Sequence, residues 1–161
     1  MENIIKIRII MENNKEMEAE LYPDVAPETV ENFVNLINQR FYDGIIFHRV
    51  ISGFMIQGGD PTGTGRGGSK KTIRGEFRSN GFENILKHTR GVLSMARTMD
   101  PNSASSQFFI IHQDAPHLDG QYAAFGKVTK GIEVVDEIAD VETDYMDKPL
   151  KPQRIKTIEI L

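Results

Sequence analysis

The chain has 161 residues, with no cysteine and no tryptophan, and 19 Lys and Arg against 23 Asp and Glu give a formal net charge of -4. This length predicts a single domain over residues 1–161, and the lack of cysteine excludes disulfides, thiolate metal sites and thiol nucleophiles. The small acidic surplus argues against a nucleic-acid partner, because such proteins usually carry a basic surplus.

The first segment predicts a strand rather than a targeting or membrane segment. Residues 4–11 are rich in isoleucine, but Lys6 and Arg8 interrupt the apolar run. A signal peptide needs ~7–15 uninterrupted apolar residues, and a membrane helix needs ~20. We therefore expect a cytoplasmic protein that does not bind membranes. As a separate expectation, the protein acts as a monomer.

The next elements follow from their periodicity. Residues 16–21 alternate charged and apolar side chains, which predicts a half-buried strand that pairs with 4–11 across the turn at 12–15. A helix is predicted to begin at Pro27, because four apolar side chains then fall on one face: Val30, Phe33, Val34 and Ile37.

The rest of the chain reads as short strands with one further helix. Residues 45–57 predict two strands with a break near Ser52-Gly53, and the glycine-rich segment 58–68 predicts a long loop. A second helix is expected at 132–139, and further strands at 92–97, 107–112, 123–129 and 154–160. Many short strands and two isolated helices predict a mainly antiparallel sandwich or barrel, in which pairing of the first and last strands would close the sheet.

Two familiar kinds of site are not supported by the sequence. Residues 63–68 match the G-x-G-x-x-G pattern, but no helical pattern follows, as a dinucleotide site requires. The four histidines have no compact metal-binding spacing. We expect no cofactor and no metal.

Two segments do suggest a binding site. In a strand, Met55 and Gln57 share a face, as do Gln107 and Phe109, so each segment places an amide beside a large apolar side chain. Arg49, close to the first of these segments in the sequence, adds a planar, positively charged guanidinium with several N–H donors. An apolar pocket rimmed by amides and one guanidinium suits an uncharged, peptide-like ligand with an apolar ring.

Five runs resemble the motifs of the cyclophilin family of peptidyl-prolyl cis-trans isomerases, in order and spacing: FHRVISGFMIQGGDPTGTGRGG, LSMAR, SSQFFI, LDG and FGKV. The short turn 41–44 resembles the compact bacterial cytoplasmic type. The resemblance implies a closed eight-stranded antiparallel β-barrel with two capping helices, a substrate groove outside the barrel, and proline-containing polypeptides as partners.

The resemblance also implies roles for single residues. Arg49 would be the catalytic residue, and Gln57 and Gln107 would hold the substrate backbone or Arg49. Ala96 and Arg97 would run alongside the peptide, which the main chain of Arg97 would bind. The proline pocket would be lined by Phe54, Met55, Phe109 and Leu118.

Three positions depart from the common pattern of the family. His117 stands where many members have Trp, Tyr122 where many have His, and Arg97 where Asn is frequent. We therefore expect weakened affinity for cyclosporin-type macrocycles. Sequence leaves open two rivals to the isomerase on the same fold, a non-catalytic proline-peptide-binding module and a chaperone-like module, and one rival built on the glycine loop, a nucleotide-dependent enzyme.

Overall fold

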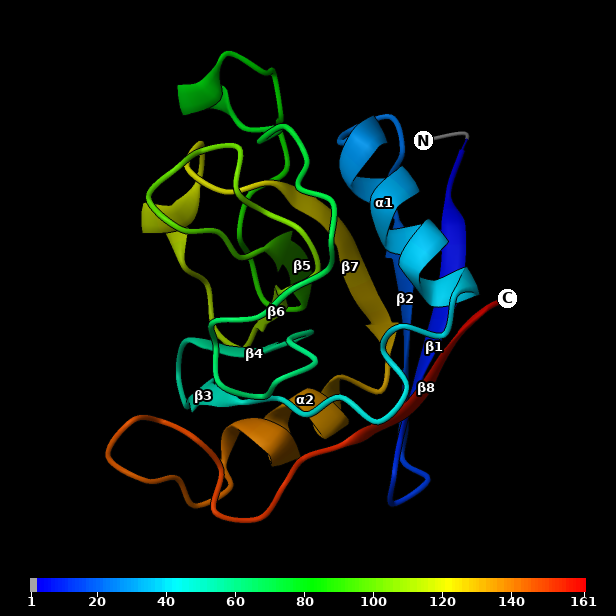
Figure 1. Cartoon of the computed structure of the whole chain (residues 1–161), viewed down its shortest axis with the longest axis vertical. Coiled ribbons are helices and arrows are strands. Elements are labelled where there is room, and N and C mark those ends of the chain that lie inside the picture. Colours follow the sequence, from blue (N-terminus) through cyan, green and yellow to red (C-terminus); the bar gives the residue numbers. More distant parts are fainter. Residues whose placement is uncertain (1–2) are drawn as a thin grey trace.

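The computed structural model describes residues 3–161, and its framework is one strongly curled antiparallel sheet (Figure 1). The strands within this range follow the spatial order β3-β4-β6-β5-β7-β2-β1-β8. Their bounds are β1 (Ile5–Met11), β2 (Glu16–Leu21), β3 (Arg49–Ile51), β4 (Met55–Gly58), β5 (Val92–Met95), β6 (Phe108–Ile111), β7 (Ala124–Lys130) and β8 (Ile155–Ile160). The prediction of a mainly β, antiparallel fold with two helices is confirmed.

The first hairpin shows how the sequence period sets the register. β1 and β2 pair antiparallel, with Ile9 opposite Met17 and Ile7 opposite Ala19. All four side chains are buried, whereas the alternating glutamates of β2 lie on the other face. The apolar half of the period-two pattern is thus the half that faces the core.

The sheet is an open half-barrel, so the prediction of a closed barrel is wrong. β3 and β8 form the two ends of the strand order and share no ladder among the described residues. The outer edge of β3 is occupied instead by a loop, because Val50 N donates to Asp147 O at 2.8 Å. The segment before β3 instead contacts the start of β8, where Ile155 N donates to Ile45 O at 2.9 Å and Ile46 forms a bridge with Arg154.

That bridge also corrects the predicted extent of the strands. Residues 45–48 are predicted to lie in a strand, but residues 45–47 make only isolated contacts with residues 153–155, such as the hydrogen bond from Phe47 N to Gln153 O at 2.9 Å. The predicted break at Ser52-Gly53 is confirmed as the turn between β3 and β4, and 58–68 is a loop after its first residue. β5 and β6 end earlier than predicted.

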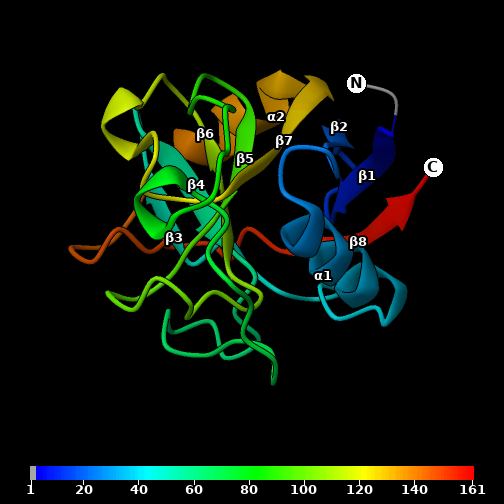
Figure 2. The ribbon, with the colours of Figure 1, turned by 90° about the horizontal axis from the view of Figure 1, so that it is seen from above.

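Two helices cover different ends of the curled sheet (Figures 1 and 2). Helix α1 (Pro27–Asn38) buries its apolar face on the core, and Thr29 at its first turn donates to the buried Glu76 carboxylate at 2.7 Å. Helix α2 (Ile132–Ala139) has the predicted bounds. Neither helix, nor any other within residues 3–161, has the length and apolar character needed to cross a bilayer.

Buried apolar side chains form two clusters on opposite faces of the sheet. The larger fills the inside of the curl and includes Phe108 and Ile110 of β6. The smaller lies on the outer face and includes Phe109 together with Met55 of β4. Successive residues of a strand point to opposite faces, so one strand serves both clusters. The predicted assignment of Phe108 and Ile110 to the core is confirmed.

Candidate functional site

A small cavity opens on the outer face, above the smaller apolar cluster. It has a volume of about 120 Å³ and is lined by residues of β3, β4 and β6 and of the segments that follow β3, β5 and β6. A volume well below that of a drug-sized site fits one compact side chain. Its lining consists of Arg49, Phe54, Met55, Gln57, Ala96, Arg97, Phe109, Leu118 and Tyr122.

The structure thus brings together nine of the eleven residues that the sequence resemblance singled out. The other two lie close by. Gln107 is hydrogen-bonded to the lining residue Gln57. His117 is exposed at the rim, where its ring centroid lies 5.5 Å from that of Phe54.

The floor of the cavity is apolar and well packed. Met55 and Phe109 are at most 4% exposed, and Leu118 of the short helix Pro116–Leu118 closes one side. Tyr122 meets the Phe109 ring edge to face, with centroids 5.7 Å apart. Such a floor favours an apolar ring through burial and aromatic contact.

Phe109 is backed by a buried polar chain that the sequence did not reveal. The His88 ring stacks on Phe109 with centroids 6.1 Å apart. Its Nδ1 lies 3.0 Å from Asp119 Oδ1, and its Nε2 lies 2.8 Å from Ser94 Oγ. Burial lowers the pKa of His88, against the opposing effect of Asp119. The neutral ring therefore donates through Nδ1 and accepts through Nε2.

The Ser94–His88–Asp119 arrangement has the connectivity of a hydrolytic triad, but it does not form a nucleophilic site. Ser94 is 0% exposed, pairs with Phe109 across neighbouring strands and does not line the cavity. A serine nucleophile must reach a substrate carbonyl. These hydrogen bonds instead hold the His88 ring against Phe109, on the protein side of the pocket. No signal in the sequence links His88 to Asp119, because the two residues are far apart in the chain.

Arg49 is the exposed cation at the mouth of the cavity. It stands on β3 directly opposite Gln57 of β4, and its Nη1 lies 3.5 Å from Gln57 Oε1. Gln57 Nε2 donates to Gln107 Oε1 at 2.9 Å. Gln107 Nε2 in turn donates to the carbonyl oxygens of Gly65 and Gly67, at 3.0 and 2.8 Å. Both amides are thereby oriented, and Gln57 presents its oxygen to Arg49.

Arg97 lines the cavity, but its guanidinium is held by the protein itself. The group lies 4.7 Å from the Phe77 ring centroid and 4.8 Å from that of Tyr122. Its Nε and Nη2 also donate to Gln121 O. The Arg97 side chain therefore supports the side of the cavity that Tyr122 forms.

A second cavity extends the first along the surface. It has a volume of about 540 Å³ and shares Gln57, Ala96 and Arg97 with the smaller one. The glycine loop forms its opposite wall, through residues 65–69. Together the two hollows make a groove that can take a peptide segment with one side chain in the small pocket.

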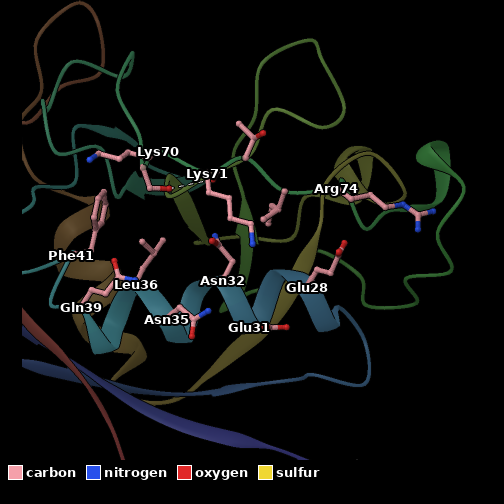
Figure 3. A pocket seen from close by; sticks show the side chains of 13 residues that line it. Glu28, Glu31, Asn32, Asn35, Leu36, Gln39, Phe41, Lys70, Lys71 and Arg74 are labelled. Atoms are coloured by element: carbon pink, nitrogen blue, oxygen red, sulfur yellow. Dashed lines mark hydrogen bonds between the residues drawn. The ribbon is translucent and has the colours of Figure 1, made fainter.

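A further cavity of about 560 Å³ lies between α1 and residues 69–74 and contains none of the predicted site residues (Figure 3). Glu28 and Glu31 stand on its helix side, and Lys70 and Lys71 on its loop side. Lys71 points across the cavity toward Asn32, and Arg74 points away (Figure 3). The volume of a cavity therefore does not by itself identify the candidate functional site in this fold.

The glycine loop does not have the geometry of a nucleotide site. No helix begins within residues 63–68 or directly after them, and backbone N–H groups of the loop donate to the Asp60 carboxylate at 2.7–3.2 Å. A carboxylate already occupies the donors that a phosphate would need. Among residues 3–161, no group of three His, Asp or Glu side chains could hold a metal ion.

Comparison with known proteins agrees with this geometry. The family model for "Cyclophilin type peptidyl-prolyl cis-trans isomerase/CLD" matches residues 6–160. The peptidyl-prolyl cis-trans isomerase ppi1 of Schizosaccharomyces pombe is 47% identical over 137 residues, which cover 84% of this chain and 86% of that protein. The peptidyl-prolyl cis-trans isomerase B of Bacillus subtilis is 47% identical over 131 residues, covering 81% and 88%.

Solved structures give the same picture. A crystal structure of a cyclophilin-type peptidyl-prolyl cis-trans isomerase from Cryptosporidium parvum superposes with a TM-score of 0.91 at 36% identity, covering 99% of this chain and 98% of that one. A second structure of that protein, determined in the presence of the dipeptide Ala-Pro, has a TM-score of 0.88 at 37% identity, covering 97% and 98%.

Proposed function

The chain belongs to the cyclophilin-type peptidyl-prolyl cis-trans isomerase family and isomerises X–Pro peptide bonds, and we propose that it does so in the small cavity beneath Arg49. The observation that carries this assignment is the placement of Arg49. Its guanidinium stands over an apolar pocket and faces an oriented amide oxygen, Gln57 Oε1. The pocket takes the proline ring, and the adjoining groove takes the residues on either side.

The reaction requires no bond to be made or broken. Amide resonance gives the X–Pro bond a rotational barrier of ~20 kcal/mol, and uncatalysed exchange takes tens of seconds. Rotation removes that resonance, so the prolyl nitrogen becomes pyramidal and gains a lone pair. An enzyme that brings exchange to milliseconds must lower the barrier by ~5.5 kcal/mol, about 10⁴-fold.

Arg49 supplies part of that reduction. A guanidinium N–H donates to the pyramidal nitrogen, which is a much poorer acceptor in the planar ground state, so the bond favours the transition state. One charged hydrogen bond contributes ~1.5–3 kcal/mol. The remainder comes from removing the polar planar amide from water and from gripping the ring between Met55, Phe109 and Leu118 while the preceding carbonyl rotates.

The other residues have supporting roles in this proposal. Gln57 orients Arg49, and Gln107 orients Gln57. Ala96 and Arg97 run alongside the peptide, which the main chain of Arg97 binds, and Phe54, His117 and Tyr122 form the rim. Because His117 offers less contact area than an indole, cyclosporin-type macrocycles bind weakly.

We further propose that the protein acts as a monomer in the cytoplasm and is of the compact bacterial type. The short turn 41–44 before the segment that leads into β3 supports the subtype, and the lack of cysteine fits a reducing compartment. Its clients are unfolded or flexible polypeptides that contain proline, and isomerisation assists their folding.

Exchange NMR on a short Ala-Pro peptide tests the proposed site. The wild-type protein should broaden or exchange-couple the cis and trans resonances, whereas Arg49→Ala, with an unchanged fold by ¹⁵N–¹H spectra, should lose most of that effect. Undiminished exchange by Arg49→Ala would remove Arg49 from the mechanism. Saturable peptide binding without faster exchange by the wild type would instead identify a binding module.

A further inference from the structure

Asp60 is a buried carboxylate around which the glycine-rich loop is folded. It follows β4 by two residues and is 1% exposed. Its Oδ2 accepts hydrogen bonds from Thr64 N, Gly65 N and Gly67 N at 3.2, 2.7 and 3.0 Å. Its Oδ1 accepts from Thr62 N at 2.8 Å. These donors hold the pKa of Asp60 down, at about 2, against the desolvation that alone would raise it.

Two of these residues are also the link to the candidate site. Gly65 and Gly67 donate their N–H groups to Asp60, and their carbonyl oxygens accept from Gln107 Nε2 at 3.0 and 2.8 Å. The same short stretch of backbone thus joins a buried carboxylate on one side to a site amide on the other. Displacement of the loop would remove both acceptors of Gln107 at once.

We propose that Asp60 is a positioning residue for Arg49, acting through the glycine loop, Gln107 and Gln57. The relay runs from Asp60 to the Gly65 and Gly67 peptide groups, then to Gln107, then to Gln57, whose oxygen lies 3.5 Å from Arg49 Nη1. The inference rests on the proposed role of Arg49, and Asp60 itself touches no substrate.

The fold of the loop around Asp60 also explains why residues 63–68, which match the G-x-G-x-x-G pattern, are rich in glycine. A side chain at Gly67 would collide with Asp60 Oδ1. Gly65, whose N–H donates to Asp60, has a φ of 89°, in the left-handed region that favours glycine. The glycines let the backbone close around the carboxylate, and no phosphate is needed to explain them.

Asp60→Asn tests the proposal with little change in shape. In either orientation of the amide, its NH₂ group faces at least one backbone N–H of the loop, so the loop must shift. We expect kcat/KM for an Ala-Pro peptide to fall roughly 10-fold, and the Gln107 side-chain amide resonances to move. Glu76→Gln is the matched control, because Glu76 is equally buried but holds the start of α1 instead.

A double-mutant cycle separates positioning from general destabilisation. If Asp60 acts through Gln107, Asp60→Asn should add less than about 2-fold to the loss caused by Gln107→Ala alone. Multiplied losses, or unmoved Gln107 resonances in Asp60→Asn, would overturn the proposal. If Asp60→Asn does not fold, Gly67→Ala disturbs the same contact without removing the charge, and the same cycle applies to it.

Arg49→Ala in the same assay keeps the two proposals apart. Retained exchange by Arg49→Ala would refute the catalytic role of Arg49 and with it the relay. Loss of exchange by Arg49→Ala, together with full kcat/KM in Asp60→Asn and in Gly67→Ala, would overturn the relay alone.

Discussion

The side-chain amide of Gln57 donates to the side-chain oxygen of Gln107 across 2.9 Å. That bond determines which end of the Gln57 amide faces Arg49, because an amide has its donor and its acceptor on opposite sides. Gln107 cannot reverse in turn, since its NH₂ group is held by the two glycine carbonyls. Arg49 therefore meets an acceptor, and its guanidinium keeps further N–H groups for a ligand.

Arg49→Lys should show that the shape of the guanidinium matters as well as its charge. A lysine ammonium is a point charge on a flexible stem and cannot present two donors in a fixed plane to Gln57 and to a substrate nitrogen. We expect kcat/KM to fall by about 10- to 100-fold, which corresponds to the loss of one charged hydrogen bond. Peptide exchange by NMR measures this, with Arg78→Ala as the control, since Arg78 is exposed outside the cavity. A lysine variant as active as wild type would contradict the two-donor role.

Phe108 and Phe109 are neighbours in the chain with different expected effects. Phe108→Ala removes a ring from the inside of the curl and should cost about 3–5 kcal/mol of unfolding free energy. Phe109→Ala opens onto the groove, where water can enter, so it should cost less stability but lower kcat/KM strongly. Urea unfolding and the peptide assay on both variants give the comparison. Equal stability losses, with kcat/KM unchanged in Phe109→Ala, would mean that the outer cluster is only core.

His117→Trp should strengthen cyclosporin binding. The larger indole at the exposed rim beside Phe54 would bury some tens of Å² more apolar surface, worth roughly 1–2 kcal/mol at ~25 cal/mol per Å². The inhibition constant should therefore fall by about 5- to 30-fold while basal kcat/KM changes little. Tyr145→Trp is a suitable control, because Tyr145 is exposed on the loop before β8 and lies outside the cavity. An inhibition constant unchanged in His117→Trp would refute the idea.

His88 should make the protein less stable in mild acid. Burial holds its folded pKa below the ordinary value of 6.5, so between the two pKa values the unfolded chain binds more protons than the folded one. The contribution of His88 is complete above pH 6.5 and is lost as the pH falls toward the folded pKa. NMR titration of the His88 ring should give a pKa below 6.5, and urea unfolding should show a lower free energy at pH 5.5 than at pH 7.5. A folded pKa at or above 6.5 would contradict the buried, neutral ring.

Much of the framework could be predicted because it depends on local patterns. The alternation in 16–21 sets which side chains of β2 face the core, and the spacing of Val30, Phe33 and Ile37 sets the face that α1 buries. The same period of two separates Phe108 from Phe109. The site residues were found through motif runs that resemble a family, and the structure gathers them around one cavity.

What escaped prediction depends on residues far apart in the chain. The half-barrel stays open at β3, where Val50 N donates to Asp147 O, and neither of these residues carries a local sign of that pairing. His88 meets Asp119 across 31 positions, and the relay from Asp60 to Arg49 passes through Gln107, 47 positions after Asp60.

By itself, then, the sequence determined three things. Its periodicity set the buried faces of the strands and helices, because periodicity acts between near neighbours. Its composition excluded thiol chemistry, and its motif runs identified the family. Only the tertiary structure decided where the sheet stays open, which buried groups support Phe109 and what the glycine loop encloses. Those features are hydrogen bonds and packing contacts between distant segments, and they exist only after the sheet has curled and brought those segments together.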